Sequence, residues 1–230
     1  MCGRITLREP RRAVSEFLET LGTELPPPRY NIGPGQETLI VRAGEAGSDR
    51  RELSMLHWGL VPAWKRDGKT TPIINARSET VAVKPIFREA FRHRRCLLLA
   101  DGFYEWKKQG GERQPFFCTL VGDQPFAIAA IWEEWQEGGS AKRGFCLLTT
   151  EANALMEPVH HRMPVLFTRK DAARWLAEGA RENLTQLLRP FPASAMEVRA
   201  VSSFVNKIGN EGPDCIAAPS EGGSEQLTFF

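Results

Sequence analysis

Apolar and polar residues recur with two different periods along the 230-residue chain, and these periods predict which segments form helices and which form strands. A spacing of 3.6 residues predicts helices from Pro10 to about Leu21 and over about 86–93, 170–176 and 181–188. Short apolar runs predict strands at residues 3–7, 38–42, 53–58, 96–100, 116–120, 126–132, 145–149 and about 196–201. This order predicts an α+β fold with a largely antiparallel, barrel-like sheet and helices outside it.

Glycine and proline mark the connections between these segments. Residues 30–35 predict a rigid loop, and residues 59–72 a long irregular connection of the kind that is often functional in compact domains. A hairpin turn is expected at Gln109-Gly110-Gly111-Glu112. One compact domain is therefore expected over residues 1–210, followed by a loose tail rich in glycine and acidic residues over 211–230.

Charge is informative only through its distribution. The formal net charge is +2, so the overall balance does not by itself indicate a nucleic-acid partner. Basic residues do gather in two stretches, 4–12 and 84–95. A basic face is one interpretation of the second stretch. The other is a solvated helix end at His93-Arg94-Arg95, where cations interact favourably with the helix dipole.

Several classes of protein and site lack their usual signals. The five cysteines include no CxxC pair, and the histidines show no metal-ligand spacing, so neither a disulfide framework nor a metal or other cofactor is expected. No apolar run approaches the length of a membrane span, and no secretory signal precedes Cys2, which favours a reducing cytoplasm. A monomer is the default for a small domain of this kind.

The amino terminus carries the first candidate chemistry. The small side chain of Cys2 favours removal of Met1, which would leave an α-amine and a thiol on one residue. With an aldehyde, the amine forms an imine and the thiol can then close a five-membered thiazolidine ring. Arg4 is expected to favour the thiolate. The simpler alternative is that Cys2 is only the second residue of a strand.

Three polar residues stand in otherwise apolar segments and are candidates for acid, base or orienting groups. Glu105 lies between Tyr104 and Trp106, where partial burial would raise its pKa and suit it to proton transfer. His160 could be a second acid/base group, and Asn75 could orient a substrate through its amide. Structural roles on a surface strand or in a turn remain open for all three.

Arginine and aromatic residues near these positions suggest contacts to a phosphodiester chain. Arg77 and Arg162 lie two residues from Asn75 and His160, so each pair shares a face in an extended segment. A guanidinium can grip a phosphate with two parallel hydrogen bonds. Flat surfaces on which unstacked bases could lie are offered by Trp58, Trp64, Trp106 and Pro34.

Six motifs, taken together and in this order, resemble the SRAP family, the SOS-response-associated peptidase proteins. They are Met1-Cys2-Gly3-Arg4, Tyr30-Asn31-x-x-Pro34, Trp58-Gly59-Leu60-x-Pro62-x-Trp64, Asn75-Ala76-Arg77-x-Glu79, Gly102-Phe103-Tyr104-Glu105-Trp106 and His160-x-Arg162-Met163-Pro164. The resemblance spans about residues 2–210 and departs from the family at Gly33-Pro34-Gly35 and in having one tryptophan, Trp64, where some members have two.

The resemblance implies that the protein recognises abasic sites in single-stranded DNA and attaches Cys2 to the ring-opened sugar as a thiazolidine. It implies catalytic roles for Cys2, Asn75, Glu105 and His160. It further implies DNA contacts by Arg4, Pro34, Trp64, Arg77, Trp106 and Arg162. Two alternatives remain at this point: a cysteine-dependent peptidase or self-processing activity, and a single-strand binding module that forms no covalent bond.

Overall fold

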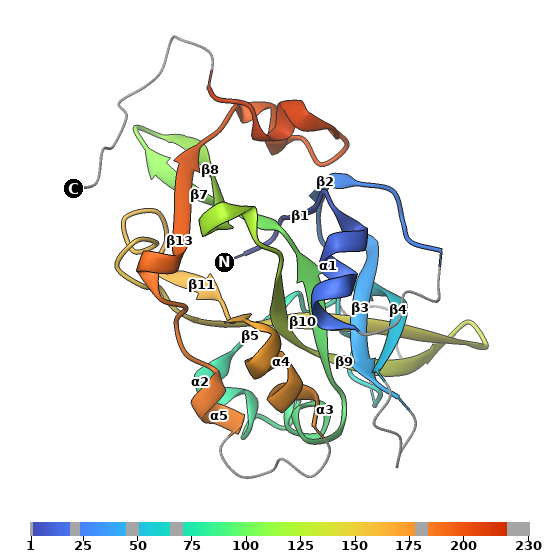
Figure 1. Ribbon diagram of the computed structural model, residues 1–230. Coiled ribbons are helices and arrows are strands. Elements are labelled where there is room, and N and C mark those ends of the chain that lie inside the picture. Colours follow the sequence, from blue (N-terminus) through green and yellow to red (C-terminus); the bar gives the residue numbers. More distant parts are fainter. Residues whose placement is uncertain (1, 19–23, 45–50, 65–70, 178–183, 220–230) are drawn as a thin grey trace.

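Two β-sheets and a few short helices make up the computed structural model, which describes residues 2–18, 24–44, 51–64, 71–177 and 184–219 (Figure 1). The first sheet is antiparallel and has the strand order β13-β8-β7-β1-β2. Its strands are β1 (Ile5–Leu7), β2 (Arg29–Ile32), β7 (Gly102–Gln109), β8 (Glu112–Leu120) and β13 (Met196–Ala200).

The second sheet closes into a barrel, because β10 pairs both with β4 and with β9. The closed ring runs β10-β4-β3-β6-β9 and back to β10, while β5, β11 and β12 pair at its margins. Its strands are β3 (Glu37–Ala43), β4 (Arg51–Trp58), β5 (Asn75–Arg77), β6 (Arg95–Ala100), β9 (Phe126–Glu137), β10 (Ser140–Glu151), β11 (Arg162–Pro164) and β12 (Leu166–Phe167).

The helices are short and lie at the outside of the sheets, as expected for an α+β fold (Figure 1). In α1 (Pro10–Phe17), Pro10 occupies the first turn, where its missing N–H leaves no hydrogen bond unmade, and Ala13, Val14 and Phe17 are buried. The others are α2 (Ser78–Val81), α3 (Arg88–His93), α4 (Arg169–Leu176) and α5 (Leu184–Leu187), with single 3-10 turns η1 (Val121–Asp123), η2 (Ala193–Ala195), η3 (Ser203–Asn206) and η4 (Pro213–Ile216).

The apolar core fills the barrel and the space between the two sheets. Trp58 is fully buried, stacks on Phe145 and donates its indole N–H to the Ile74 carbonyl over 3.0 Å. The expectation that Trp58 offers a surface for DNA bases is therefore wrong. No helix in the described residues is long and apolar enough to cross a bilayer.

The fold departs from the predicted one in three places. Residues 30–32, expected in a loop over 30–35, belong to β2 because that segment pairs with β1. The barrel also contains parallel pairings of β10 with β4 and β5, whose connections to β10 are long enough to allow either direction. Residues 211–219, expected in a loose tail, include η4 with its buried Cys215, and Glu211 pairs with Arg29 at 2.6 Å. The rest of that tail, 220–230, lies outside the described residues.

Candidate active site

The pairing of β1 with β7 brings the amino-terminal segment beside Glu105. The Tyr104 N–H donates to the Arg4 carbonyl over 2.9 Å, which continues the antiparallel register toward residue 2. Cys2 is fully buried and Glu105 is 2% exposed. Burial raises the pKa of the Cys2 thiol, and the neighbouring charge of Glu105 raises it further. A cysteine and a carboxyl group thus share one apolar environment.

Asn75 reaches the same place from the other sheet. Its Nδ2 donates to the Cys2 carbonyl over 2.8 Å, while its buried Oδ1 has no hydrogen-bond partner among the described residues. The parallel pairing of β5 with β10 fixes the Asn75 backbone. The site therefore lies where the two sheets meet, and Asn75 both holds residue 2 and keeps one acceptor available.

Glu105 has the electrostatics of a proton-transfer group. Burial raises its pKa to about 7, and the positive charge of the amino terminus acts in the opposite direction. A carboxyl group with such a pKa is present in both protonation states near neutral pH, which suits it to donate and then accept a proton. The expectation of a raised pKa for Glu105 agrees with this direction.

His160 is half-buried just before β11, and its ring stacks on His161 at a centroid distance of 4.5 Å. His160 Nδ1 lies 2.9 Å from the Arg162 backbone nitrogen and 3.1 Å from the Arg162 carbonyl oxygen, so it accepts from the first or donates to the second, depending on the tautomer. Burial lowers the pKa of His160, and the positive charge of the amino terminus acts in the same direction. The lowered pKa favours the neutral imidazole at pH 7. The charge of the amino terminus acts on both His160 and Glu105.

The three arginines expected at DNA phosphates differ in what they contact. Arg162 forms a two-pronged ion pair with Glu79, at 2.5 and 3.0 Å, and also donates to the Thr149 carbonyl. Arg4 donates to Asn31 Oδ1 and to the Val205 carbonyl, away from the Cys2 thiol. The Arg77 backbone pairs with Thr149 of β10, while its exposed side chain makes no hydrogen bond within the described part of the chain and its charge helps to lower the pKa of Glu79. Arg77 alone has a guanidinium free to meet a phosphate.

The position of Arg4 overturns one expectation about the thiol. Arg4 was expected to stabilise a Cys2 thiolate, but its guanidinium lies over the Trp106 ring, 5.6 Å from the ring centroid. Burial also raises the pKa of Cys2 rather than lowering it. The thiol is consequently protonated at neutral pH and needs a base in order to react.

The residues expected to contact bases are also unequally available. Trp64 is 64% exposed, at the start of the partly described long loop. Pro34 is half-buried in a tight turn before Gly35, whose φ of 82° favours glycine. Trp106 is half-buried, and its indole N–H donates to Asn206 Oδ1 over 2.7 Å. Trp64 is thus the aromatic side chain most open to a ligand in this set.

Comparisons with known proteins identify the family. The family model described as SOS response associated peptidase (SRAP) matches residues 1–208. The chain belongs to the SRAP family. Abasic site processing protein YoqW of Bacillus subtilis is 37% identical and aligns over 94% of this chain and 99% of its own length. Abasic site processing protein YedK of Escherichia coli is 30% identical, over 94% and 99% respectively.

Solved structures agree with the SRAP fold. A protein of Bacteroides thetaiotaomicron superposes with a TM-score of 0.77 over 94% of this chain and 99% of its own, at 22% identity. A Bordetella bronchiseptica protein gives a TM-score of 0.74 over 87% and 100%, at 25% identity. These likenesses confirm the expected single α+β architecture with a barrel-like sheet.

Two structural partners within the SRAP motifs were missed by reasoning from the sequence. Asn31 is fully buried, accepts from Arg4 and donates to the carbonyls of Lys207 and Asn210, which ties β2 to the segment after β13. Glu79 forms an ion pair with the guanidinium of Arg162. Both stood in the quoted motifs, but no local pattern links residues so far apart in the chain. No cluster of three or more metal-ligating side chains occurs in the described ranges.

Proposed function

We propose that this protein processes abasic sites in single-stranded DNA by forming a covalent thiazolidine between Cys2 and the ring-opened deoxyribose, after removal of Met1. The observation that carries the proposal is the 2.8 Å hydrogen bond from Asn75 to the Cys2 carbonyl, beside a buried Glu105 whose pKa is about 7. Relatives named as abasic site processing proteins support the choice of substrate. Met1 itself lies outside the described residues.

The first step opens the sugar. An abasic deoxyribose is mostly a closed hemiacetal, and its aldehyde is released when the ring oxygen gains a proton and the anomeric hydroxyl loses one. Protonated Glu105 supplies the proton to the ring oxygen. Because its pKa is about 7, a substantial fraction of Glu105 is protonated at neutral pH. The carboxylate left behind is then available as a base.

The second step joins protein and DNA through nitrogen. The α-amine of Cys2 adds to the aldehyde carbon and one water leaves, which gives an imine. Asn75 holds the Cys2 backbone, and its unpartnered Oδ1 can accept an N–H of the attacking amine or of the product. This arrangement holds the attacking amine in a fixed direction.

The third step closes the ring. The Cys2 sulfur bonds to the imine carbon, the C=N pair of electrons moves to nitrogen, and the thiol proton passes by way of the Glu105 carboxylate to that nitrogen. Such a base is needed because burial raises the pKa of the thiol. Since amine and thiol belong to one residue, closure is intramolecular, an advantage of up to about 7–11 kcal/mol in well-oriented cases. The product therefore outlasts a simple imine.

His160 acts at the sugar in this scheme. Its Nδ1 lies against the Arg162 backbone, which orients the imidazole, and the neutral ring carries one proton that it can exchange with the sugar. The lowered pKa keeps the ring neutral, which allows it to donate without adding positive charge beside the attacking amine. Arg162, whose side chain is held by Glu79, orients the His160 ring through its backbone, and the exposed Arg77 guanidinium can contact a phosphate.

The test uses single-stranded oligonucleotides of one sequence, carrying either a natural abasic site or its tetrahydrofuran analogue, which has no aldehyde. We expect a heat-stable protein–DNA product on denaturing gels with the natural abasic strand and none with the analogue. Unrelated peptides should remain uncut under the same conditions. Cleavage of those peptides with no DNA product would favour a peptidase instead, and equal retention of both strands would favour a non-covalent binding module.

A further inference from the structure

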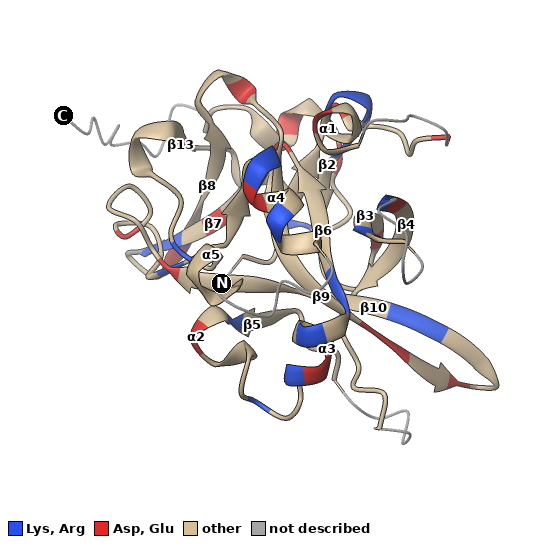
Figure 2. Cartoon of the chain, turned by 60° about the horizontal axis from the view of Figure 1, so that its bottom comes forward, with Lys and Arg blue, Asp and Glu red and all other residues tan. Residues whose placement is uncertain are grey.

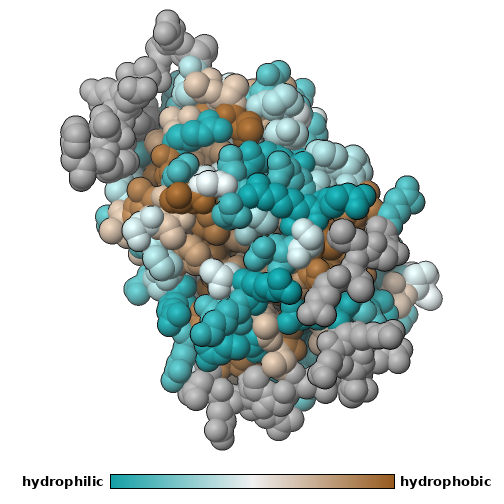
Figure 3. All heavy atoms as spheres, in the orientation of Figure 1, coloured by the Kyte–Doolittle hydropathy of each residue, from teal (hydrophilic) through white to brown (hydrophobic). Residues whose placement is uncertain are grey.

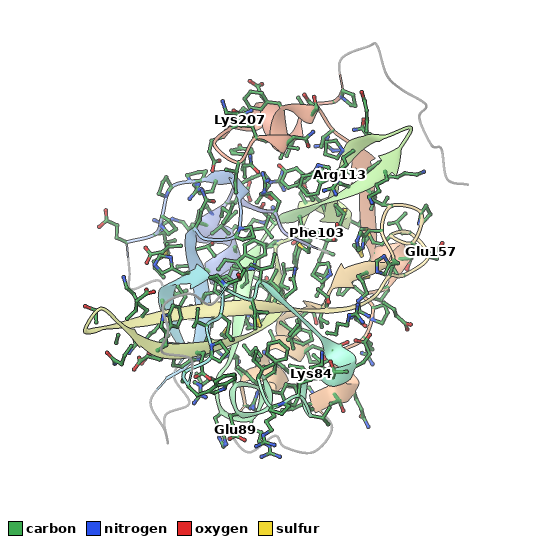
Figure 4. The ribbon with its side chains drawn as sticks, turned by 180° about the vertical axis from the view of Figure 1, so that it is seen from behind. Lys84, Glu89, Phe103, Arg113, Glu157 and Lys207 are labelled. Atoms are coloured by element: carbon green, nitrogen blue, oxygen red, sulfur yellow. The ribbon has the colours of Figure 1, made fainter. Side chains whose placement is uncertain are left out.

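Four exposed basic side chains lead away from the candidate site along the surface. We call Arg77, Lys84, Arg88 and Arg92 the α2–α3 track. The track begins two residues after Asn75, and Figure 2 shows Lys and Arg positions on β5, on the connection between α2 and α3, and on α3. Lys84 and Glu89 lie at the end of the molecule opposite Lys207 (Figure 4).

Local packing explains why these four side chains face outward. Val81 and Phe87 are buried under the α2–α3 connection, and Ala90 and Phe91 form the inner face of α3. Arg88 and Arg92 are four residues apart and so share one face of α3, which points away from the buried face of Ala90 and Phe91. The charges are therefore held on a fixed backbone and project into solvent.

The two arginines that follow the track have internal roles instead. Arg94 forms an ion pair with Glu133 at 2.6 Å. Arg95 donates to the carbonyls of Phe91, Arg92, Trp175 and Ala177, and so caps the ends of α3 and α4. The basic stretch at 84–95 therefore has two parts. Arg94 and Arg95 at its end stabilise the fold, and the basic residues before them face outward.

The outward-facing part carries more positive charge than its surroundings neutralise. Neither Arg77 nor Lys84 makes a hydrogen bond through its side chain within the described residues. Arg88 and Arg92 both approach the single carboxylate of Glu89, at 3.6 and 3.5 Å. The other acidic residue of this stretch, Glu79, is already engaged by Arg162. A surface of this kind attracts a polyanion.

Figure 3, in the orientation of Figure 1, shows hydrophobic surface interleaved with hydrophilic side chains. We propose that the α2–α3 track binds the phosphate backbone of the single strand on one side of the abasic nucleotide. The proposal rests on the proposed function, because it extends the same bound strand beyond the site. Exposed Lys and Arg side chains bind phosphates in a salt-dependent, sequence-independent way.

The test measures equilibrium binding of a tetrahydrofuran-containing single strand by fluorescence anisotropy at several salt concentrations. The track variant is Lys84→Gln/Arg88→Gln/Arg92→Gln. The matched control is Lys142→Gln/Arg143→Gln/Arg174→Gln, which removes the same charge from exposed positions on β10 and α4. All six side chains are exposed, so both variants should unfold at the wild-type temperature.

For the track variant we expect the slope of log affinity against log salt to become less negative by about 2, since each lost phosphate contact on a single strand contributes about 0.7. The control should keep nearly the wild-type slope. Lengthening the strand on one side of the lesion should strengthen wild-type binding, and this gain should disappear in the track variant.

Equal slopes for the track and control variants would overturn the inference. The proposed function is tested separately by the natural abasic strand. If the wild type forms the covalent product but the two variants bind alike, only the track is wrong. If the wild type forms no product, the proposed function fails whatever the slopes are.

Discussion

Cys2 and Cys146 are both fully buried thiols, yet their surroundings differ completely. Cys146 lies in the closed barrel, opposite Ile131 of β9, and burial alone raises its pKa. Cys2 lies where the two sheets meet, with Glu105 beside it and Asn75 on its carbonyl. Burial raises the pKa of the thiol in both places, so each thiol needs a base in order to react. What distinguishes the site is that two other segments bring the polar groups of Glu105 and Asn75 beside Cys2.

Replacing each thiol in turn tests most strongly whether Cys2 and Cys146 have different roles. Cys2→Ala should abolish the heat-stable product with an abasic single strand, because it removes the sulfur that closes the ring. Cys146→Ala should keep the product and instead lower the free energy of unfolding by about 1 kcal/mol. Denaturing gels and chemical denaturation measure the two effects. A stable product from Cys2→Ala would contradict the role given to the thiol.

Glu105→Gln should have the next largest effect. An amide cannot exchange a proton, so we expect the rate of product formation to fall by about 10²–10⁴. The wild-type rate should also lose its acid-dependent component as pH rises through about 7, where Glu105 deprotonates. The variant should lack that component. An unchanged pH profile in single-turnover kinetics would exclude Glu105 as the proton donor.

The same carboxyl group predicts a pH dependence of stability. Its pKa is raised on folding from its ordinary value near 4.3 to about 7, so the folded state binds more protons between these values. Glu105 therefore favours folding below about pH 4, and this contribution is lost as pH rises to about 7. Glu105→Gln should flatten the stability profile in that window, which urea titrations at several pH values can measure.

Asn75→Ala should slow the reaction by about tenfold to a hundredfold, since a buried hydrogen bond and its unpaired partner are worth about 1–3 kcal/mol. Asn153 offers a matched control: its Nδ2 donates to the Phe191 carbonyl over 2.7 Å, in a part of the molecule outside the site. Asn153→Ala should destabilise the fold without slowing the folded fraction. Equal slowing in both variants would mean that Asn75 acts only through stability.

Arg77→Gln should have the smallest effect. Loss of one phosphate contact predicts a few-fold weaker binding of a single strand and a salt slope less negative by about 0.7. Because the Arg77 side chain has no hydrogen bond to lose within the described residues, the unfolding temperature should not change. Anisotropy and thermal melting on the same sample test both statements. A lower melting temperature would show that Arg77 has a structural role after all.

Much of the fold could be predicted because the strands that form the core are recognisable in the sequence as apolar runs. The strands expected at 96–100 and 38–42 correspond to β6 and β3. β9 and β10 extend beyond the expected 126–132 and 145–149, because their hairpin end is exposed and polar and carries no apolar pattern. β2 was missed because Gly33 and Pro34 favour a loop locally, while pairing with β1 decides the outcome.

The candidate site could be predicted by residue type but not by partner. Asn75, Glu105 and His160 stood out as polar residues in apolar segments, and the first two lie beside Cys2. The sequence could not show which arginines are free to bind a phosphate. Arg162 pairs with Glu79, 83 residues away, and Arg4 donates to the distant Val205 carbonyl. Such pairings depend on tertiary structure, and they separate arginines that support the fold from one that is free to bind.

The account depends most directly on where the DNA is attached, and peptide mass spectrometry of the purified adduct measures this. After digestion with trypsin and nuclease, we predict that the peptide Cys2–Arg4 carries the sugar with the loss of one water and no longer reacts with a thiol-alkylating reagent. A sugar attached to a lysine, or an adduct in which Met1 still precedes Cys2, would contradict the account.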